Sequence, residues 1–394
     1  MLAQTAAKTQ SAPFTRSTFT WLAYVMLAYF AYTQAGLGPA MPFLRAELGL
    51  SYTLGGLHVT AFAVGMVGAG LVGAMLAQRW GRTVIFWGGG GGMALGALLF
   101  ILGQSAFVTV PASLVMGLCG TLLVATIQST LSDHHGAQRA TALTEANVAA
   151  SLGTTAVPVL LGGFAATVVG WRGAFLAAVV ACGVLWWIGR GVPVPAANEG
   201  RPADAAAPDV PLPRAFWGYW LAMVLCVAVE WSLITWSAEY LDGVVGLERE
   251  LASALMSAFF VAMVIGRVVG SLLTRRMASA RLLPVALGIA LLGFLVFWLA
   301  PLPWLNVAGL FVAGLGIANL FPQGLAAAQN LAADQADRAS ARVALAAGLA
   351  ILIAPQVLGT AADVIGLQTA LGLIVVLLAA AMGVIAVTMR LRGK

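Results

Sequence analysis

The chain has 394 residues, of which 61% are hydrophobic and only 9% are charged. A soluble protein of this length cannot bury so much apolar surface, so we predict a polytopic membrane protein. The net charge of +6 does not indicate nucleic-acid binding, because the basic residues stand mainly in short loops between apolar segments, as membrane topology requires.

Twelve apolar segments of the chain are expected to cross a bilayer as helices, each of which needs about 20 apolar residues. The first is longer than a signal-peptide core and is expected to be retained as a helix. We therefore predict an all-α membrane protein with twelve transmembrane helices, at residues 19–39, 53–77, 84–104, 108–130, 141–164, 173–189, 215–237, 252–274, 282–300, 305–328, 342–362 and 369–389.

One connection is longer than the others and is rich in proline, alanine and acidic residues, which is typical of a flexible linker. It separates two halves of six helices each. The expected units are an N-terminal half at residues 1–189, a cytoplasmic linker at 190–214 and a C-terminal half at 215–394.

The two halves repeat one another at an offset of 196 positions. The offset places the segment 163–170 (GFAATVVG) on 359–366 (GTAADVIG), and it places Gln34 on Glu230. One offset that matches separate places predicts two pseudo-symmetric halves, related by an axis along the membrane normal.

The distribution of lysine and arginine predicts the orientation of the chain. Sixteen of these 20 residues fall on or beside the side of the termini and the linker, and Arg267 lies within a span. The opposite side carries only Arg45, Arg172 and Arg249. Basic residues gather on the cytoplasmic side, so we expect a multi-pass protein of the inner membrane with both termini in the cytoplasm.

The loop after the second helix, residues 74–83 (AMLAQRWGRT), carries the most specific motif. The chain resembles the transporters of the major facilitator superfamily along nearly its whole length, and this motif is the most specific part of the resemblance. Their pattern is Gly-x-Leu-Ala-Asp-Arg-x-Gly-Arg-Arg/Lys, which this chain follows at Leu76, Ala77, Arg79, Gly81 and Arg82 and departs from at Ala74, Gln78 and Thr83.

The resemblance implies a gating role for this loop. A glycine lets the chain turn tightly between antiparallel helices. The arginines, Arg79 and Arg82, can pair with helix C-terminal carbonyls or with an acid such as Asp133. Two departures argue against a drug/proton antiporter: Ser113 stands where such proteins often carry an arginine, and their glycine-proline signature in helix 5 is absent from residues 157–163 (VPVLLGG).

The segment 216–236 carries a single ionisable residue, Glu230, about 20 Å from its cytoplasmic end and a little beyond the midplane. A charge at that depth costs at least about 2.5 kcal/mol, so such residues face a cavity or a partner. Two interpretations remain open. Glu230 is either a protonated acid bonded between helices or a site for substrate or proton.

Helices 1, 4, 7 and 10 line a central cavity in the proteins that this chain resembles. The residues implied for substrate or proton binding are Tyr29, Tyr32, Gln34, Gln128, Glu230, Trp231, Asn319 and Gln323. Asn319 and Gln323 are four residues apart, hence on one helix face, and flank Pro322. Tyrosines also belong to interfacial belts. No basic residue is expected at midplane depth, so we expect a neutral or cationic small organic solute.

Glu145 in helix 5 and Arg267 in helix 8 lie at similar depths, about 6–11 Å inside the cytoplasmic boundary. The resemblance implies that these helices face each other across the two halves. We predict an ion pair that closes the cytoplasmic side, with Glu230 too distant to be the partner of Arg267. The alternative is that each residue reaches the interface or bonds within its own half.

The sequence does not favour an enzyme. The histidines are His58, His134 and His135, and neither a His-Glu-x-x-His nor a Gly-x-Ser-x-Gly motif occurs. No Walker loop is present, and a transporter-like sensor would need a signalling partner. We predict a proton-coupled secondary transporter of a small organic solute that works by alternating access, a monomer without cofactor, metal or nucleic-acid partner. The alternatives are a drug or multidrug efflux antiporter and a transporter-like membrane sensor.

Overall fold

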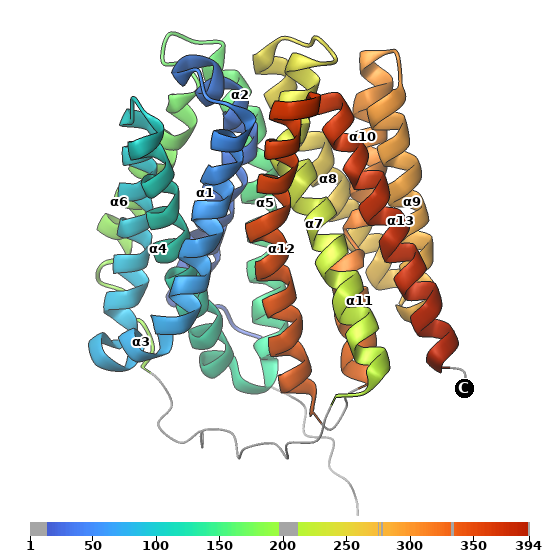
Figure 1. Ribbon diagram of the computed structural model, residues 1–394. Coiled ribbons are helices and arrows are strands. Elements are labelled where there is room, and N and C mark those ends of the chain that lie inside the picture. The colour runs from blue at the N-terminus through green and yellow to red at the C-terminus, as the bar shows by residue number, and fades with distance from the viewer. Residues whose placement is uncertain (1–13, 197–211, 275, 277–278, 332–334, 393–394) are drawn as a thin grey trace, which may run out of the picture.

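The computed structural model describes residues 14–196, 212–274, 276, 279–331 and 335–392. Within these ranges the secondary structure is helical (Figure 1). The first part of the chain forms α1 (Thr18–Ala35), α2 (Leu37–Leu48), α3 (Tyr52–Leu102), α4 (Ala106–His135), the 3₁₀ turn η1 (Gly136–Gln138), α5 (Arg139–Ala165) and α6 (Arg172–Gly189). The second part forms α7 (Arg214–Gly243), α8 (Arg249–Leu273), α9 (Ser279–Leu299), α10 (Pro303–Ile317), α11 (Leu320–Leu331), α12 (Ala336–Ile365) and α13 (Leu367–Arg392).

Helix α3 contains the turn that the motif predicts. Gly81 has φ 79° and ψ 157°, a backbone conformation that suits glycine. Gly65 and Gly96, on either side of the turn, both approach α4, at Leu118 and Met116 respectively. Because two positions about equally far from Gly81 meet the same part of α4, the chain reverses its direction at Gly81.

Two of the expected spans are interrupted. The first is divided at Gly36 into α1 and α2, and it extends to Leu48 rather than ending at residue 39. The tenth is divided between Ile317 and Leu320, close to Pro322. Proline lacks the N–H that continues a helix, so a break near Pro322 fits its chemistry.

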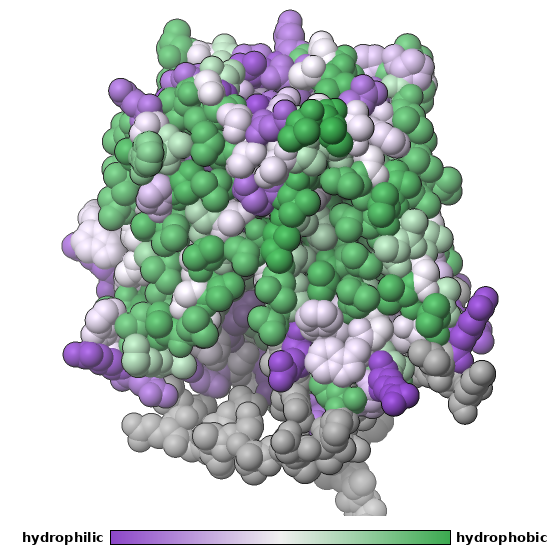
Figure 2. Space-filling view, in the orientation of Figure 1, coloured by the Kyte–Doolittle hydropathy of each residue, from purple (hydrophilic) through white to green (hydrophobic). Residues whose placement is uncertain are grey.

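The surface of the bundle is suited to a lipid environment. Within the described residues, nine helices are long and apolar enough to cross a membrane, counting α3 once, α4 with α5 once and α10 with α11 once. The count of twelve spans stays a prediction. Large apolar side chains such as Leu71, Phe107 and Trp187 are exposed, and Figure 2 shows a broad apolar band with polar residues toward both ends. This distribution is expected where hydrocarbon replaces water.

Two hydrophobic cores organise the helices. One is built from residues between Phe19 and Val194, and the other mainly from residues between Leu212 and Ile385. We call these helix groups the N-terminal bundle (α1–α6) and the C-terminal bundle (α7–α13). Most of the predicted linker, residues 197–211, lies outside the described residues, so the proposed division at 190–214 stays a prediction.

The contacts between elements define two ends of the molecule. One end, which we call the linker end, contains the end of α6 and the start of α7, on either side of the predicted linker. There Arg82 donates to the carbonyl of Ala196, and Thr20 of α1 bonds the ring of His135 at the end of α4. The start of α7 also meets the end of α13 there, at Gly218 and Thr388. The far end contains the connections between α2 and α3, between α7 and α8, and between α12 and α13. The first and last described helices therefore begin and end at the same end of the bundle.

The two bundles approach each other closely at the far end. A Cβ atom on Gly38 of α2 would overlap the carbonyl of Ile234 on α7 and would lie 3.2 Å from the Cα atom of Thr235. A Cβ atom on Gly359 of α12 would lie 2.7 Å from the carbonyl oxygen of Tyr52. Glycine is therefore the residue that allows this contact between backbones.

We expect Gly38→Ala to destabilise the contact between α2 and α7, because the new methyl group meets backbone atoms that cannot rotate away. Overpacking of this kind costs about 1–3 kcal/mol. The apparent melting temperature in detergent should fall. Gly70→Ala is the matched control, since a Cβ atom there meets nothing within 4 Å. Equal melting temperatures for the two variants would contradict this account.

Candidate substrate cavity

A cavity of about 980 Å³ separates the two bundles. Its walls come from α5, α7, α8, α11 and α12, with Ala318 and Asn319 from the break between α10 and α11. Thr144, Ser271 and Thr274 belong to its lining and stand near the linker end of their helices. The cavity therefore extends from the middle of the bundle toward the linker end.

A smaller chamber of about 170 Å³ adjoins the inner part of this cavity. It adds Gln34 of α1 and Ser151 and Thr154 of α5 to the polar lining. The two spaces share four residues, Asn147, Glu230, Trp231 and Arg267. These four residues form the polar centre of the cavity, and we call them the central cluster.

Glu230 and Arg267 face the same space. Arg267 of α8 lies close enough to attract the carboxylate of Glu230 electrostatically. The ion pairs of the described residues include neither side chain, so both charges are available to the cavity. Opposite charges that share a cavity can each bind part of a ligand or exchange partners when one is protonated.

Two expectations about Arg267 were wrong. Glu230 was expected to lie too far along the membrane normal to be its neighbour, and no basic group was expected at the depth of the binding residues. The structure places both residues in one lining. A depth that is counted along the backbone ignores the length of the arginine side chain, which carries its charge far from the helix axis.

Four other predicted binding residues line the cavity or its inner chamber: Gln34, Trp231, Asn319 and Gln323. Asn319 donates to the carbonyl of Gly266 at 2.7 Å, which ties the break between α10 and α11 to α8. The side-chain oxygen of Gln323 is buried and has no hydrogen-bond partner among the described residues. Gln34 and Glu230, which the repeat offset relates, meet in the inner chamber.

Three predicted residues lie elsewhere. Tyr29 donates to the carbonyl of Gly90 at 3.3 Å, and Tyr32 donates to the carbonyl of Ala174 at 2.9 Å. Both hydroxyls therefore point into the N-terminal bundle. Gln128 is exposed on α4 and stands apart from the cavity lining. Side chains on one helix point in all directions around its axis, so a place in a cavity-lining helix does not ensure contact with the cavity.

The predicted gating residues occupy the linker end. Arg82 donates to Asp133 at 2.6 Å, so the expected pairing of the motif with this acid is present, whereas Arg79 is exposed. Glu145 accepts two hydrogen bonds from Arg16 and one from Tyr24. In this conformation Glu145 thus bonds within its own bundle, while Arg267 lines the cavity.

Two groups of residues were not predicted from the sequence. The first is the polar face of α5, with Asn147, Ser151 and Thr154. Their spacing of three and four residues along an expected span could have indicated one polar face. The second is a network of charges at the far end, whose members come from helices that are far apart in the chain, so that no local pattern connects Arg45 with Glu239 or Asp363 with α3.

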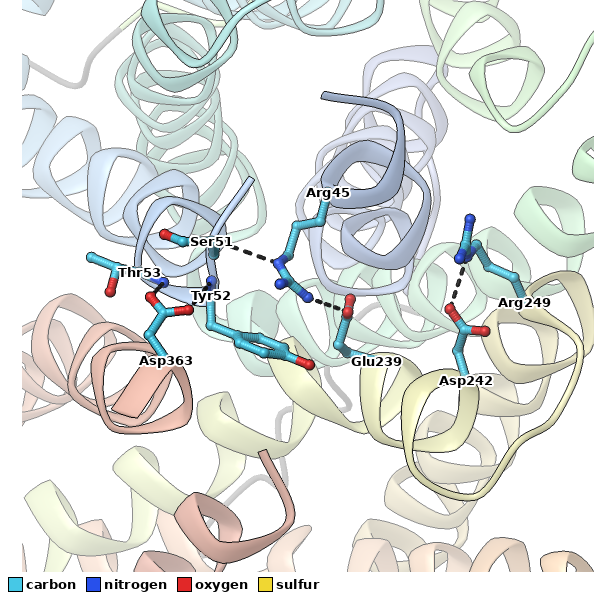
Figure 3. A network of polar contacts seen from close by, with 8 residues as sticks. All are labelled: Arg45, Ser51, Tyr52, Thr53, Glu239, Asp242, Arg249 and Asp363. Carbon is cyan, nitrogen blue, oxygen red and sulfur yellow. Dashed lines mark hydrogen bonds and ion pairs between the residues drawn. The ribbon is translucent and has the colours of Figure 1, made fainter. Parts of the chain in front are cut away.

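The far-end network joins the two bundles (Figure 3). Arg45 of α2 pairs with Glu239 of α7, and its guanidinium lies 3.5 Å from the centre of the Tyr52 ring. Asp363 of α12 accepts hydrogen bonds from the backbone N–H groups of Tyr52 and Thr53, at 2.7 and 2.8 Å. These are the first N–H groups of α3, which carry the positive end of the helix dipole, so Asp363 caps a helix of the other bundle.

Further contacts extend this closure toward the middle of the molecule. Ser253 of α8 donates to the carbonyl of Pro39 at 3.0 Å, and Thr60 of α3 donates to the carbonyl of Leu352 at 2.9 Å. The bundles are therefore joined at the far end and separated by the cavity at the linker end.

A cavity with a charged centre between two helix bundles, closed at one end, is the architecture of a membrane transporter. The chain belongs to the Major Facilitator Superfamily, whose family model matches residues 20–355. It is an MFS transporter and not an enzyme.

Relatives and solved structures agree with this assignment. An uncharacterized MFS-type transporter of Yersinia pestis is 27% identical over 367 residues, which cover 89% of this chain and 91% of that protein. An uncharacterized transporter of Sinorhizobium fredii is 30% identical over 166 residues, 41% of this chain and 44% of that one.

Two solved structures share the fold. A bacterial homolog of the human lysosomal transporter Spinster, in an inward-facing and occupied conformation, has a TM-score of 0.77 at 16% identity. That match covers 96% of this chain and 98% of the other. The nucleoside transporter NupG has a TM-score of 0.76 at 11% identity, and the match covers 95% of this chain and 98% of the other. At these identities the likeness shows the fold alone.

Proposed function

We propose that the protein is a proton-coupled secondary transporter that moves a small organic solute by alternating access. The observation that carries the proposal is the central cluster, in which Glu230 and Arg267 share a cavity closed at the far end. A carboxylate can take up a proton, a guanidinium can bind an anionic or polar substrate, and one open end lets both enter from the same side.

The linker end is the cytoplasmic side in this proposal, and the conformation is inward-facing. The three far-end arginines support this orientation, because each is paired with an acid: Arg45 with Glu239, Arg172 with Glu47 and Arg249 with Asp242. The hydrogen bond from Arg172 also holds the pKa of Glu47 below its usual value, so this acid keeps its charge. The excess of basic residues then belongs to the linker end, which the positive-inside rule assigns to the cytoplasm.

Coupling follows from the competition between charges in the cavity. While Glu230 is ionised, it attracts the guanidinium of Arg267. Protonation of Glu230 removes that attraction and leaves Arg267 free for the substrate. Binding of a proton and binding of the substrate would then favour one another, as coupled transport requires.

The gate at the cytoplasmic side belongs to the same proposal. When that side closes, α5 and α8 would approach, and Glu145 would exchange Arg16 for Arg267. The hydrogen bonds between Glu145 and Arg16 keep this acid occupied while the cavity is open. The loop pair between Arg82 and Asp133 would hold the turn at Gly81 in place during the same motion.

The test is transport in proteoliposomes that carry a proton gradient and are offered a mixed pool of metabolites, with the gradient imposed in each direction. We expect one solute class to accumulate, and we expect a protonophore to abolish the accumulation. Mass spectrometry of the vesicle contents identifies the solute. Saturable binding without flux in either direction would instead indicate a transporter-like sensor and would contradict the proposal.

A further inference from the structure

The seam between α5 and α8 is open over part of its length. Near the far end the two helices touch, because a Cβ atom on Gly162 would lie 2.8 Å from the Cβ atom of Ala254. Toward the linker end they enclose a groove of about 480 Å³. It runs from Thr155 to Thr144 on α5 and from Val261 to Ser271 on α8, a length of about 15 Å along the helix axes.

The outer side of this groove is lined by apolar residues that are exposed on the surface of the protein. Val148 and Leu152 of α5 are 58% and 69% exposed, and Val268 of α8 is 56% exposed. In a bilayer these side chains would meet hydrocarbon. A groove of this kind can accept an apolar chain without removing any polar group from water.

The inner end of the groove is polar and adjoins the substrate cavity. Thr144, Asn147, Arg267 and Ser271 line both the groove and the cavity. Arg267 therefore stands between the apolar groove on the bilayer side and the central cluster of the cavity. An occupant of the whole space would need one hydrocarbon part and one anionic part.

The opposite seam, between α3 and α12, is packed in its part toward the far end. Val59 and Ala63 of α3 form a buried apolar cluster with Ala350 and Ile351 of α12. The hydrogen bond from Thr60 to the carbonyl of Leu352 fastens the same stretch. Both seams are therefore packed toward the far end, and Arg267 lies in the part of the α5–α8 seam that is open.

We propose that the substrate is an amphipathic organic anion whose head binds Arg267 in the cavity and whose hydrocarbon tail lies in the groove between α5 and α8. This inference rests on the proposed transport function and names its substrate class. The occupant is the tail of the substrate, and the charge at the inner end selects for an anionic head within the cavity. The groove also gives such a molecule a lateral path between the membrane and the cavity.

The test measures binding of radiolabelled decanoate to the purified protein in phosphatidylcholine nanodiscs, with empty nanodiscs subtracted. Butyrate is the probe for the head alone, and decanol is the uncharged competitor. Decanoate should bind at least tenfold more tightly than butyrate, since each buried methylene contributes about 0.8 kcal/mol and 1.4 kcal/mol is a factor of ten. Decanol should compete weakly.

Substitutions separate the two parts of the site. Val268→Trp fills the groove and should weaken decanoate binding about tenfold while butyrate binding stays unchanged. Val148→Trp fills it from the opposite wall and should do the same. Val269→Trp is the matched control, because the next residue along α8 lies about 100° around the helix and is also exposed, at 47%. Arg267→Gln should weaken the binding of both anions.

Size-exclusion profiles and melting temperatures show which variants are folded. The proposal is overturned if decanol competes as strongly as decanoate, if butyrate and decanoate bind equally, or if neither tryptophan in the groove weakens decanoate binding. A failure of this substrate proposal can be distinguished from a failure of the proposed transport function. Proton-driven accumulation of a different solute would leave the transport function standing, whereas decanoate binding without proton-driven flux of any solute would remove it.

Discussion

Glu230→Gln is expected to reduce proton-driven accumulation of the substrate to the level of empty liposomes, while exchange of substrate between the two sides persists. Glutamine has nearly the same shape and can donate and accept hydrogen bonds, but it cannot take up or release a proton. Arg267 would no longer be attracted by a charge on α7, so substrate should bind at all pH values. The coupling is therefore lost, but the path through the protein remains.

The measurement compares two assays on the same proteoliposomes: net uptake under a proton gradient, and counterflow of labelled substrate without a gradient. Glu248→Gln is the matched control, since this exposed acid precedes α8 at the far end and stands outside the cavity lining. It should behave as the wild type in both assays. Normal accumulation by Glu230→Gln would show that Glu230 is a structural acid, which is the other interpretation that the sequence leaves open.

Asp363→Ala is expected to open the far end. This substitution removes two hydrogen bonds from a carboxylate to the first N–H groups of α3, at 2.7 and 2.8 Å, and leaves those groups without their partner in the other bundle. Hydrogen bonds to charged groups contribute about 1.5–3 kcal/mol. Because 1.4 kcal/mol is a factor of ten, the ratio of far-end-open to far-end-closed molecules should rise roughly tenfold to a hundredfold.

Thiol labelling from the far side reports this change. Ser253→Cys is the reporter, because Ser253 is fully buried and donates a hydrogen bond to the carbonyl of Pro39 across the interface between the bundles. Cysteine has nearly the same shape as serine. The native thiols at Cys182 and Cys226 are buried, and Cys119 can be replaced by alanine in every sample. An impermeant maleimide should modify the reporter faster in Asp363→Ala than in the background protein.

The matched control for Asp363→Ala is Asp242→Ala. Asp242 also lies at the far end and also accepts a hydrogen bond, from Arg249 at 2.8 Å, but both residues belong to the C-terminal bundle (Figure 3). Its removal breaks an ion pair within one bundle and leaves Arg249 over the Phe43 ring of α2, 5.9 Å from the ring centre, so the labelling rate should stay at the background value. Equal rates for Asp363→Ala and Asp242→Ala would show that Asp363 does not hold the two bundles together.

Local patterns account for what the sequence alone determined. Composition and the length of the apolar segments identified a helical membrane protein, since hydrocarbon requires each spanning segment to satisfy its own backbone hydrogen bonds. The motif at residues 74–83 located the turn at Gly81 and the pairing of Arg82 with Asp133, and it indicated the family. The cost of burying a charge singled out Glu230, and the repeat offset related it to Gln34, which lines the same chamber.

Tertiary structure decided which side chains meet. Arg267 reaches the cavity, whereas Tyr29 and Tyr32 point into their own bundle. Asp363 caps α3 from the other bundle, and Glu145 bonds Arg16 in this conformation. The physical reason is that helix periodicity fixes only how residues are arranged around one axis. The rotation of each helix against its neighbours, and the state of the gap between the bundles, depend on packing between segments that are far apart in the chain.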